Sequence, residues 1–255
     1  MPRNLRDESV DPKGTMVDAH CHVDLYPHPT EIVAEIESRS IYTIAVTNAP
    51  SVFHYTASIT AHCKYVRAAA GLHPELVHSH GRELDLLWPL LDQTRYVGEI
   101  GLDYVTTNEE DRRNQRAVFT QILERCSADG NKVITLHSRR AAADVIASVG
   151  NNYPGKVILH WFSGSGAELG RAVSFGMYFS VNTAMVGSKK GQMLIAKMPP
   201  DRVVTESDGP FVSIGDEPAR PHHMAEVIKK LAILWQVSPE EARSKVLSNF
   251  RALVS

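Results

Sequence analysis

The chain has 255 residues, of which 43% are hydrophobic and 22% charged, proportions that are ordinary for a globular protein with a full core. Its formal net charge of −2 excludes the broad basic surface that grips duplex nucleic acid regardless of sequence. Three widely spaced cysteines, Cys21, Cys63 and Cys126, exclude a disulfide framework and indicate a reducing compartment.

Residues 1–15 are polar and balanced in charge, which predicts an N-terminal extension outside the folded unit. They contain no apolar run typical of a signal peptide, and no later run is long enough to cross a membrane. We therefore expect a cytoplasmic protein that does not bind a membrane. No linker, repeat or low-complexity tract interrupts residues 16–255, so these are expected to form a single domain.

Short apolar runs recur along the chain, and each is followed by a longer amphipathic stretch. The runs predict eight strands, at 15–19, 42–47, 65–71, 96–101, 132–136, 156–160, 176–181 and 202–206. Helices are predicted between them at 29–39, 54–62, 83–92, 109–129, 140–149, 166–175 and 188–198, and after the last strand at 221–235 and 239–253.

Strands that alternate with helices indicate parallel βαβ units, and eight of them in this length fit a closed (β/α)8 TIM-type barrel. The alternative is a doubly wound open sheet, whose first turn from strand to helix should carry a glycine-rich phosphate loop. Here that turn reads "HCHVDLYPHP" and contains no glycine. The predicted fold class is therefore the α/β barrel, with catalytic groups at the C-terminal ends of several strands.

Histidines and carboxylates fall at these predicted strand ends. The stretch "VDAHCHVD" at 17–24 places His20 and His22 two residues apart, so both imidazoles point to one face of the strand and Cys21 to the other. Imidazole suits several divalent metals, although an isolated pair of this kind is more often found on a protein surface. Further candidates close or follow other strands: His73, Glu99, His137, His160 and Asp208.

The size of this set predicts two metal ions rather than one. A single catalytic zinc needs only about three protein ligands and an open position. Four histidines and two carboxylates, with His73 in addition, indicate two ions that share a ligand. Glu99 is the natural bridge because it is central in strand order and its two oxygens can bind different ions. The mixed nitrogen and oxygen ligands leave magnesium, manganese, cobalt and zinc open.

In this order and spacing, "DAHCHVD", "GLHP", "GEIGLD", "LHSR", "LHWFSG" and "ESDGP" resemble the motifs of the TatD family of metal-dependent deoxyribonucleases, within the wider amidohydrolase-like barrels. The resemblance runs from Met16 to the C-terminal "SNF". It implies that His20, His22 and Asp208 bind one metal ion, that His137 and His160 bind the second, and that Glu99 bridges them.

The resemblance also implies how the substrate is handled. His73 would face the scissile phosphate, and Asp208 would handle the proton of the attacking water. Ser138 and Arg139 match a polar pair of the family and are implied phosphate contacts. Trp161 lies beside a candidate ligand, where an exposed aromatic would stack a nucleotide base or else pack against a neighbouring loop.

One segment departs from the family pattern. Relatives often carry an Arg-Asn-Glu-Pro segment after the last strand, whereas this chain reads "EPARPHHM". Arg220 stands in for the family arginine as a substrate contact, and His222 and His223 replace its polar neighbours. The compact chain also resembles the TatD-like subunit of the four-gene Qat phage-defence system, which implies protein partners in a defence complex.

The predicted activity is two-metal hydrolysis of DNA phosphodiester bonds, as an exonuclease on single-stranded ends. Many amidohydrolase-like enzymes bridge their metals with a carboxylated lysine, and Glu99 in that place favours phosphodiester cleavage. Two alternatives stay open: a hydrolase of small amides, lactones or phosphoesters, and a non-catalytic barrel that serves as a binding subunit. The metal, the choice between DNA and RNA, the end polarity and the oligomeric state stay open as well.

Overall fold

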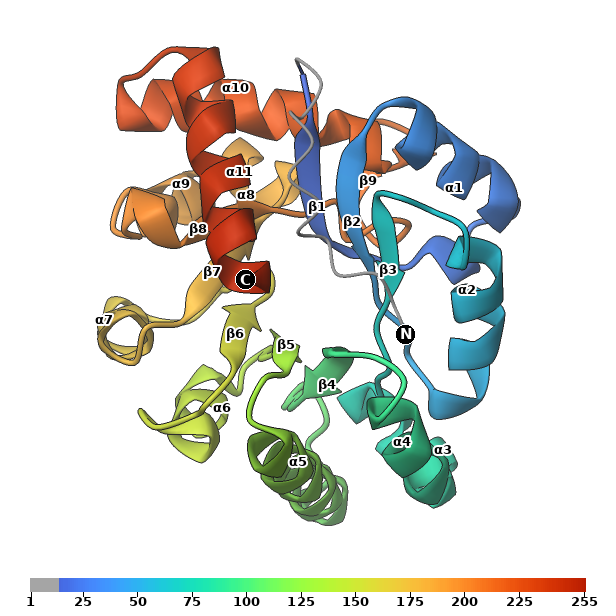
Figure 1. The fold of residues 1–255 in the computed structure, drawn as a ribbon. Helices are drawn as coiled ribbons and strands as arrows, with labels where there is room; N and C mark the ends of the chain where they lie inside the picture. The colour runs from blue at the N-terminus through green and yellow to red at the C-terminus, as the bar shows by residue number, and fades with distance from the viewer. Residues whose placement is uncertain (1–13) are drawn as a thin grey trace.

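A computed structural model describes residues 14–255, so the predicted extension at 1–15 lies outside the described residues except for Gly14 and Thr15. Thr15 is buried, and its carbonyl oxygen accepts a hydrogen bond from Arg243 Nη1 at 3.1 Å. Eight parallel strands form a ring, and the helices lie outside it (Figure 1). The predicted (β/α)8 barrel is confirmed.

The strands of the ring follow one another in chain order. They are β1 (Met16–Cys21), β2 (Ile41–Ala45), β3 (Val66–Ala68), β4 (Tyr96–Gly101), β5 (Val133–His137), β6 (Lys156–Leu159), β7 (Tyr178–Val181) and β8 (Val203–Thr205). Their neighbouring pairs run parallel, in the orders β1-β2-β3 and β4-β5-β6-β7-β8. Every residue of β2 is buried, as expected where helices cover a parallel sheet.

The helices occupy the outer layer. They are α1 (Pro29–Ser38), α2 (Phe53–Thr60), α3 (Val77–His80), α4 (Leu84–Leu91), α5 (Glu109–Asp129), α6 (Ala142–Val149), α7 (Gly166–Ser174), α8 (Thr183–Gly187), α9 (Lys189–Ile195), α10 (Met224–Trp235) and α11 (Pro239–Val254). One-turn 3-10 helices lie at Val23–Leu25, Pro50–Val52, Pro74–Leu76, Gly81–Glu83, Pro200–Arg202 and Pro221–His223. None of the helices described between residues 14 and 255 combines the length and the apolar character needed to cross a bilayer.

Two seams close the ring. Between β3 and β4, Gly98 N donates to the carbonyl oxygen of Ala70 at 2.9 Å. Between β8 and β1, Asp208 N donates to the carbonyl oxygen of His20, and His22 N to that of Gly209, each at 2.9 Å. The second seam joins the first and last strands of the barrel, so the N-terminal histidine pair lies next to the end of β8.

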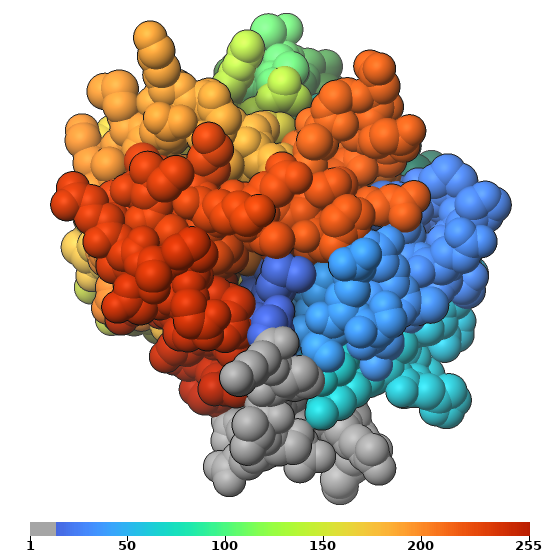
Figure 2. Space-filling model, turned by 90° about the horizontal axis from the view of Figure 1, so that it is seen from above, coloured from blue at the N-terminus to red at the C-terminus, as the bar shows by residue number. Residues whose placement is uncertain are grey.

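The C-terminal helices seal this seam from outside. Helix α11 packs against β1 and β8, and the ring of Phe250 stacks on Tyr42 of β2 with centroids 5.8 Å apart. Figure 2 shows these helices, in red and orange, beside the blue N-terminal segments. The two ends of the described barrel therefore share one part of the core.

Most predicted elements have the expected places, with three differences. The helix predicted at 188–198 is α9, and an additional short helix, α8, precedes it with Asn182 as its own N-cap. The short helix α3 precedes the helix predicted at 83–92. A two-stranded hairpin of β9 (Ser213–Ile214) and β10 (Glu217–Pro218) was not predicted, since its half-exposed two-residue strands carry no hydrophobic pattern.

Candidate metal centre

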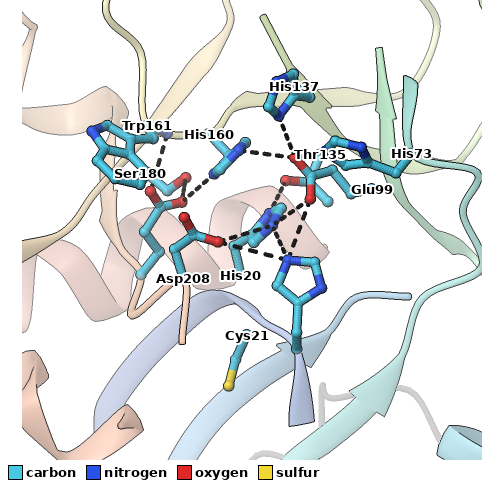
Figure 3. A network of polar contacts seen from close by, with 12 residues as sticks. His20, Cys21, His73, Glu99, Thr135, His137, His160, Trp161, Ser180 and Asp208 are labelled. Atoms are coloured by element: carbon cyan, nitrogen blue, oxygen red, sulfur yellow. Dashed lines mark hydrogen bonds and ion pairs between the residues drawn. The ribbon is translucent and has the colours of Figure 1, made fainter. Parts of the chain in front are cut away.

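The carboxylate of Glu99 lies at the centre of a group of histidines at the C-terminal end of the barrel (Figure 3). Its Oε2 atom lies 3.4 Å from His20 Nε2 and 3.3 Å from His22 Nε2. Its Oε1 atom lies 2.6 Å from His137 Nδ1 and 3.0 Å from His160 Nε2. The two oxygens of one side chain thus face two separate pairs of histidines.

Asp208 completes the group on the Oε2 side. Its Oδ1 atom lies 3.8 Å from His20 Nε2 and 3.6 Å from His22 Nε2, which are themselves 3.3 Å apart. The ring of His22 and that of His20 are both fully buried, and Cys21 points away from them toward Gly209. This is the arrangement that the alternation of side chains along a strand predicts.

His73 joins the group on the Oε1 side, with its Nε2 atom 3.4 Å from Glu99 Oε1. It follows β3, and its own Nδ1 atom accepts a hydrogen bond from Glu75 N at 3.2 Å. The structure therefore brings His73 and the six candidate ligands into one cluster, drawn from the ends of β1, β3, β4, β5, β6 and β8. Their roles as ligands stay a prediction.

The local backbone helps to aim two of these side chains. The pairing register shifts between Asp18 and Cys21 in β1, and between Val97 and Ile100 in β4. Irregularities of this kind re-aim side chains and are frequent beside active sites. Glu99 lies within the shifted part of β4, and its carboxylate contacts histidines at the ends of β1, β5 and β6.

The spacing of the ligand atoms fits metal ions. Around a tetrahedral ion with bonds of about 2.0–2.1 Å, neighbouring ligand atoms lie about 3.3 Å apart. The atoms of His20, His22 and Glu99 that face one another are separated by 3.3–3.4 Å. Two imidazole nitrogens directed at each other and at carboxylate oxygens are positioned to share a cation. The residues of this cluster therefore fit the divalent metal ions that the family resemblance implies.

The charges in this cluster favour cations as well. Burial raises the pKa of Glu99, but the surrounding His73, His160 and His20 outweigh it and hold the pKa well below its usual range. Burial lowers the pKa of His160, but Glu99 and Glu206 raise it well above its usual value. The carboxylates therefore stay ionised, and either protons on the histidines or metal ions balance them.

A second layer of polar groups orients the histidines. Asp103 Oδ2 accepts a hydrogen bond from His137 Nε2 at 2.7 Å, and this leaves Nδ1 free to face Glu99. The Oγ1 atom of Thr135 lies 2.9 Å from His20 Nδ1. Partners of this kind fix the tautomer and the ring orientation of metal-binding histidines.

Glu206 lies beside His160 as a charged neighbour, while the buried Nδ1 atom of His160 has no hydrogen-bond partner among the described residues. Its Oε2 atom lies 3.4 Å from His160 Nδ1 and accepts the hydroxyl of Ser180. Its Oε1 atom accepts hydrogen bonds from Asn182 Nδ2 and from the backbone N–H of Trp161, each at 3.0 Å. This buried carboxylate thereby links the turn at Trp161 to Ser180 and Asn182, next to the candidate ligand His160.

A cavity of about 670 Å³ opens onto the cluster. Four of the five predicted substrate contacts line it: His73, Ser138, Arg139 and Trp161. The fifth, Arg220, is not among the lining residues, and its Nη1 atom lies 3.3 Å from Glu35 Oε2 of helix α1. The structure therefore does not bring Arg220 to the cavity, because an acidic partner on the outer layer holds its guanidinium there.

Several residues of the site were not predicted from the sequence. Asp103 and Glu206 lie inside the motifs "GEIGLD" and "ESDGP", and Thr135 lies two residues before His137 on β5, so each carried a signal. Asn48 and Phe211 also line the cavity, and no pattern indicated them. The Oδ1 atom of Asn48 is buried and has no hydrogen-bond partner among the described residues.

Comparisons with known proteins agree over almost the whole described chain. A sequence model of the family described as TatD related DNase matches residues 17–255. The chain is 27% identical to the uncharacterized metal-dependent hydrolase YcfH of Escherichia coli, over 93% of this chain and 95% of that protein. It is 24% identical to the human deoxyribonuclease TATDN3, over 85% and 87% of the two chains. The crystal structure of the TatD homologue YjjV from E. coli superposes with a TM-score of 0.83 at 24% identity, covering 93% of this chain and 97% of that one.

Proposed function

Because the chain belongs to the TatD related DNase family, we propose that it hydrolyses DNA phosphodiester bonds with two divalent metal ions bound in the described cluster. The observation that carries the proposal is the carboxylate of Glu99, whose two oxygens face two separate groups of ligands. Bound there, the ions would polarise phosphate oxygens and supply a water acidic enough to attack at neutral pH. Magnesium, manganese and zinc are the candidates.

The remaining chemistry falls to side chains that line the cavity. Burial raises the pKa of Asp208, but contact with His22 and the charges of His160 and His20 lower it below its usual range. Asp208 is therefore ionised and able to take the proton of the attacking water. His73 faces the scissile phosphate from the opposite group of ligands.

Ser138 and Arg139 would hold the phosphates on either side of the reacting one. Both follow β5 and line the cavity, and the guanidinium of an exposed arginine such as Arg139 can grip a phosphate through two parallel hydrogen bonds. Such local contacts position a strand without requiring a basic surface over the whole molecule.

The proposed substrate is the end of a single strand. The cavity volume of about 670 Å³ lies within the range of about 300–1,000 Å³ that is typical of pockets for small ligands. This size supports the entry of terminal nucleotides rather than of a double helix. Residues 16–255 would act as one catalytic unit, in the cytoplasm and without a membrane partner.

A role in a phage-defence complex is a separate part of the proposal. Its support is the compact chain, which resembles the TatD-like subunit of Qat systems. The expected result is that the chain co-purifies with other proteins of such a system and that Glu99→Ala abolishes protection from phage in a plating assay. Full protection by the variant would contradict this part alone.

Cleavage of an end-labelled single-stranded oligonucleotide tests the activity. Wild-type protein should shorten the strand with magnesium, manganese or zinc, and EDTA should abolish the shortening. Glu99→Ala should lose at least about a thousandfold in rate, because it removes the ligand that both ion sites share. A strand labelled at either end gives the polarity, and an RNA strand of the same sequence tests the choice of sugar.

Metal analysis of the same samples separates the alternatives. Two ions per wild-type chain and fewer in Glu99→Ala would support the proposed centre. A folded wild-type protein that carries two ions and leaves every strand intact would contradict the nuclease proposal. Small phosphoesters, lactones and amides would then be the substrates to assay, and inertness toward all of them would favour a binding subunit.

A further inference from the structure

We propose that Trp161 and Phe211 form a stacking subsite that holds unpaired nucleobases next to the scissile phosphodiester. The inference rests on the proposed nuclease function and adds to it the feature of the substrate that is recognised. Both side chains line the cavity over the metal centre. Only three Phe, Trp or Tyr side chains of residues 14–255 are exposed, and these are two of them.

Trp161 is held at the rim of the cavity by a strained turn. Its φ angle is +38°, in the left-handed region that a bulky side chain rarely adopts. The backbone N–H of Trp161 donates to Glu206 Oε1 at 3.0 Å, and Glu206 is fixed in turn by Asn182 and Ser180. Strain of this kind persists only where the surroundings impose it, and it is concentrated at ligand-binding sites.

The strained turn leaves the indole ring of Trp161 accessible from the cavity. Trp161 is 37% exposed although it directly follows the buried ligand His160. Figure 3 shows its ring at the edge of the group of side chains, away from Glu99 and His73, so the indole does not pack between these candidate ligands. A large apolar surface next to a catalytic cluster is the type of feature that marks a ligand groove.

Phe211 stands beside the other group of ligands. It follows Asp208 in the turn after β8, where its N–H donates to the Asp208 carbonyl oxygen at 2.9 Å. The rings of Phe211 and His22 meet edge to face, with centroids 4.9 Å apart and an interplanar angle of 87°. Phe211 is nevertheless 58% exposed, so this contact orients the ring and leaves most of it uncovered.

The two aromatics therefore flank the cluster, one next to a ligand of each proposed ion. Bases of any identity stack on aromatic rings, and single-strand binding proteins use this contact without reading sequence. A paired base has both faces covered by its neighbours in the duplex and has to be unstacked first. Stacking here selects unpaired ends, and Arg139 on the same cavity can hold the adjoining phosphate.

The test compares two end-labelled single strands that differ only in their last three nucleotides, which carry bases in one strand and are abasic tetrahydrofuran units in the other. Wild-type protein should prefer the strand with bases about tenfold or more in kcat/KM, the size expected for one or two stacked bases. Trp161→Ala and Phe211→Ala should each bring this ratio toward one, mainly through a higher KM. Trp161→Phe should keep most of the preference.

Tyr55→Ala is the matched control, because Tyr55 is the third exposed aromatic and does not line the cavity. It should keep the wild-type ratio, and thermal melting of all variants checks that they fold. Equal rates of wild-type protein on the two strands would overturn the subsite and leave the nuclease function standing. A kcat/KM ratio that stays at the wild-type value in both Trp161→Ala and Phe211→Ala would overturn the subsite as well.

Binding measured in EDTA separates the subsite from the activity. Fluorescence anisotropy of the two labelled strands should show tighter binding of the strand with bases to wild-type protein, and Trp161→Ala should remove the difference. Equal binding of both strands overturns the subsite even where metal-loaded protein cleaves DNA. If no strand is cut but the difference in binding is present, the nuclease function fails and the subsite stands.

Discussion

Asp103 holds the imidazole of His137 from the side opposite Glu99, with 2.7 Å between Asp103 Oδ2 and His137 Nε2. Its other oxygen accepts the N–H of Val105, so the carboxylate is itself fixed. We expect Asp103→Asn to weaken metal binding about 10- to 100-fold, because the amide no longer fixes which ring nitrogen carries the proton. Titration of the metal-free protein with manganese or zinc, followed by calorimetry, measures this.

Asp144→Asn is the matched control, since Asp144 is an exposed carboxylate that accepts a hydrogen bond from Tyr104 at 2.7 Å, away from the ligands. Its metal affinity should equal that of the wild type. An Asp103→Asn protein with wild-type affinity would show that the geometry of His137 is fixed by packing alone.

Glu206 is the fully buried acceptor for Ser180, Asn182 and the N–H of Trp161. We expect Glu206→Ala to lower the free energy of unfolding by about 3 kcal/mol or more, because each buried donor left without a partner costs about 1–3 kcal/mol. Urea unfolding measures the change. Glu217→Ala, an exposed site in β10, should change it by less than about 0.5 kcal/mol. Similar midpoints for the two variants would refute this account.

At the scale of single residues, the positions that follow from the order of the strands were predicted from the sequence. The six candidate ligands and His73 converge because the C-terminal ends of parallel strands in a ring necessarily face one space. Arg220 lies beyond the last strand, where no such constraint acts, and Glu35 decides its position. Phe211 was missed because exposure within a turn has no signature in a sequence.

At the scale of elements, β3 and β4 approach each other closely at Gly71, within the motif "GLHP". A Cβ atom at Gly71 would collide with main-chain atoms of Gly98 and Glu99. We expect Gly71→Ala to lower the free energy of unfolding by about 3 kcal/mol, because a backbone contact cannot relax as a flexible side chain does. It should also lower the amount of bound metal, since the displaced segment carries Glu99, the proposed bridging carboxylate.

Gly170→Ala provides the comparison for urea unfolding and metal analysis. Gly170 lies within α7, and a Cβ atom there would meet nothing within 4 Å. Alanine should stabilise this helix by about 0.5–1 kcal/mol and leave the metal content unchanged. If Gly71→Ala behaved in the same way, the close approach of the two strands would not be what positions Glu99.

The elements themselves were predicted where a periodic pattern was long enough to be distinctive. Helix α5 (Glu109–Asp129) has the predicted bounds because Asn108 caps its first turn and Gly130 ends it. Helix α8 (Thr183–Gly187) was missed because five residues are too few to show a helical period, whereas α9 (Lys189–Ile195) lies within the predicted range of 188–198. Ser188 caps α9, and its Oγ atom accepts a hydrogen bond from Gly191 N at 3.0 Å.

At the scale of the whole molecule, metal binding should stabilise the fold. Ions that bind only the native state at a hundred times their Kd raise the free energy of unfolding by about 2.7 kcal/mol. For a chain of this size we expect EDTA to lower Tm by about 5–10 °C and added zinc or manganese to restore it. Differential scanning fluorimetry gives the value, and Glu99→Ala should show a much smaller shift. Identical melting with and without EDTA would exclude tightly bound ions.

The seam between β8 and β1 also bears on how the protein is made. His20 and His22 leave the ribosome early, whereas Asp208, which completes their group, is translated only after all eight barrel strands. A product of premature termination before β8 has the histidines but neither the closed ring nor this carboxylate. If the chain is the nuclease proposed above, an unfinished chain released in the cell would lack a complete metal centre and should be inactive toward DNA.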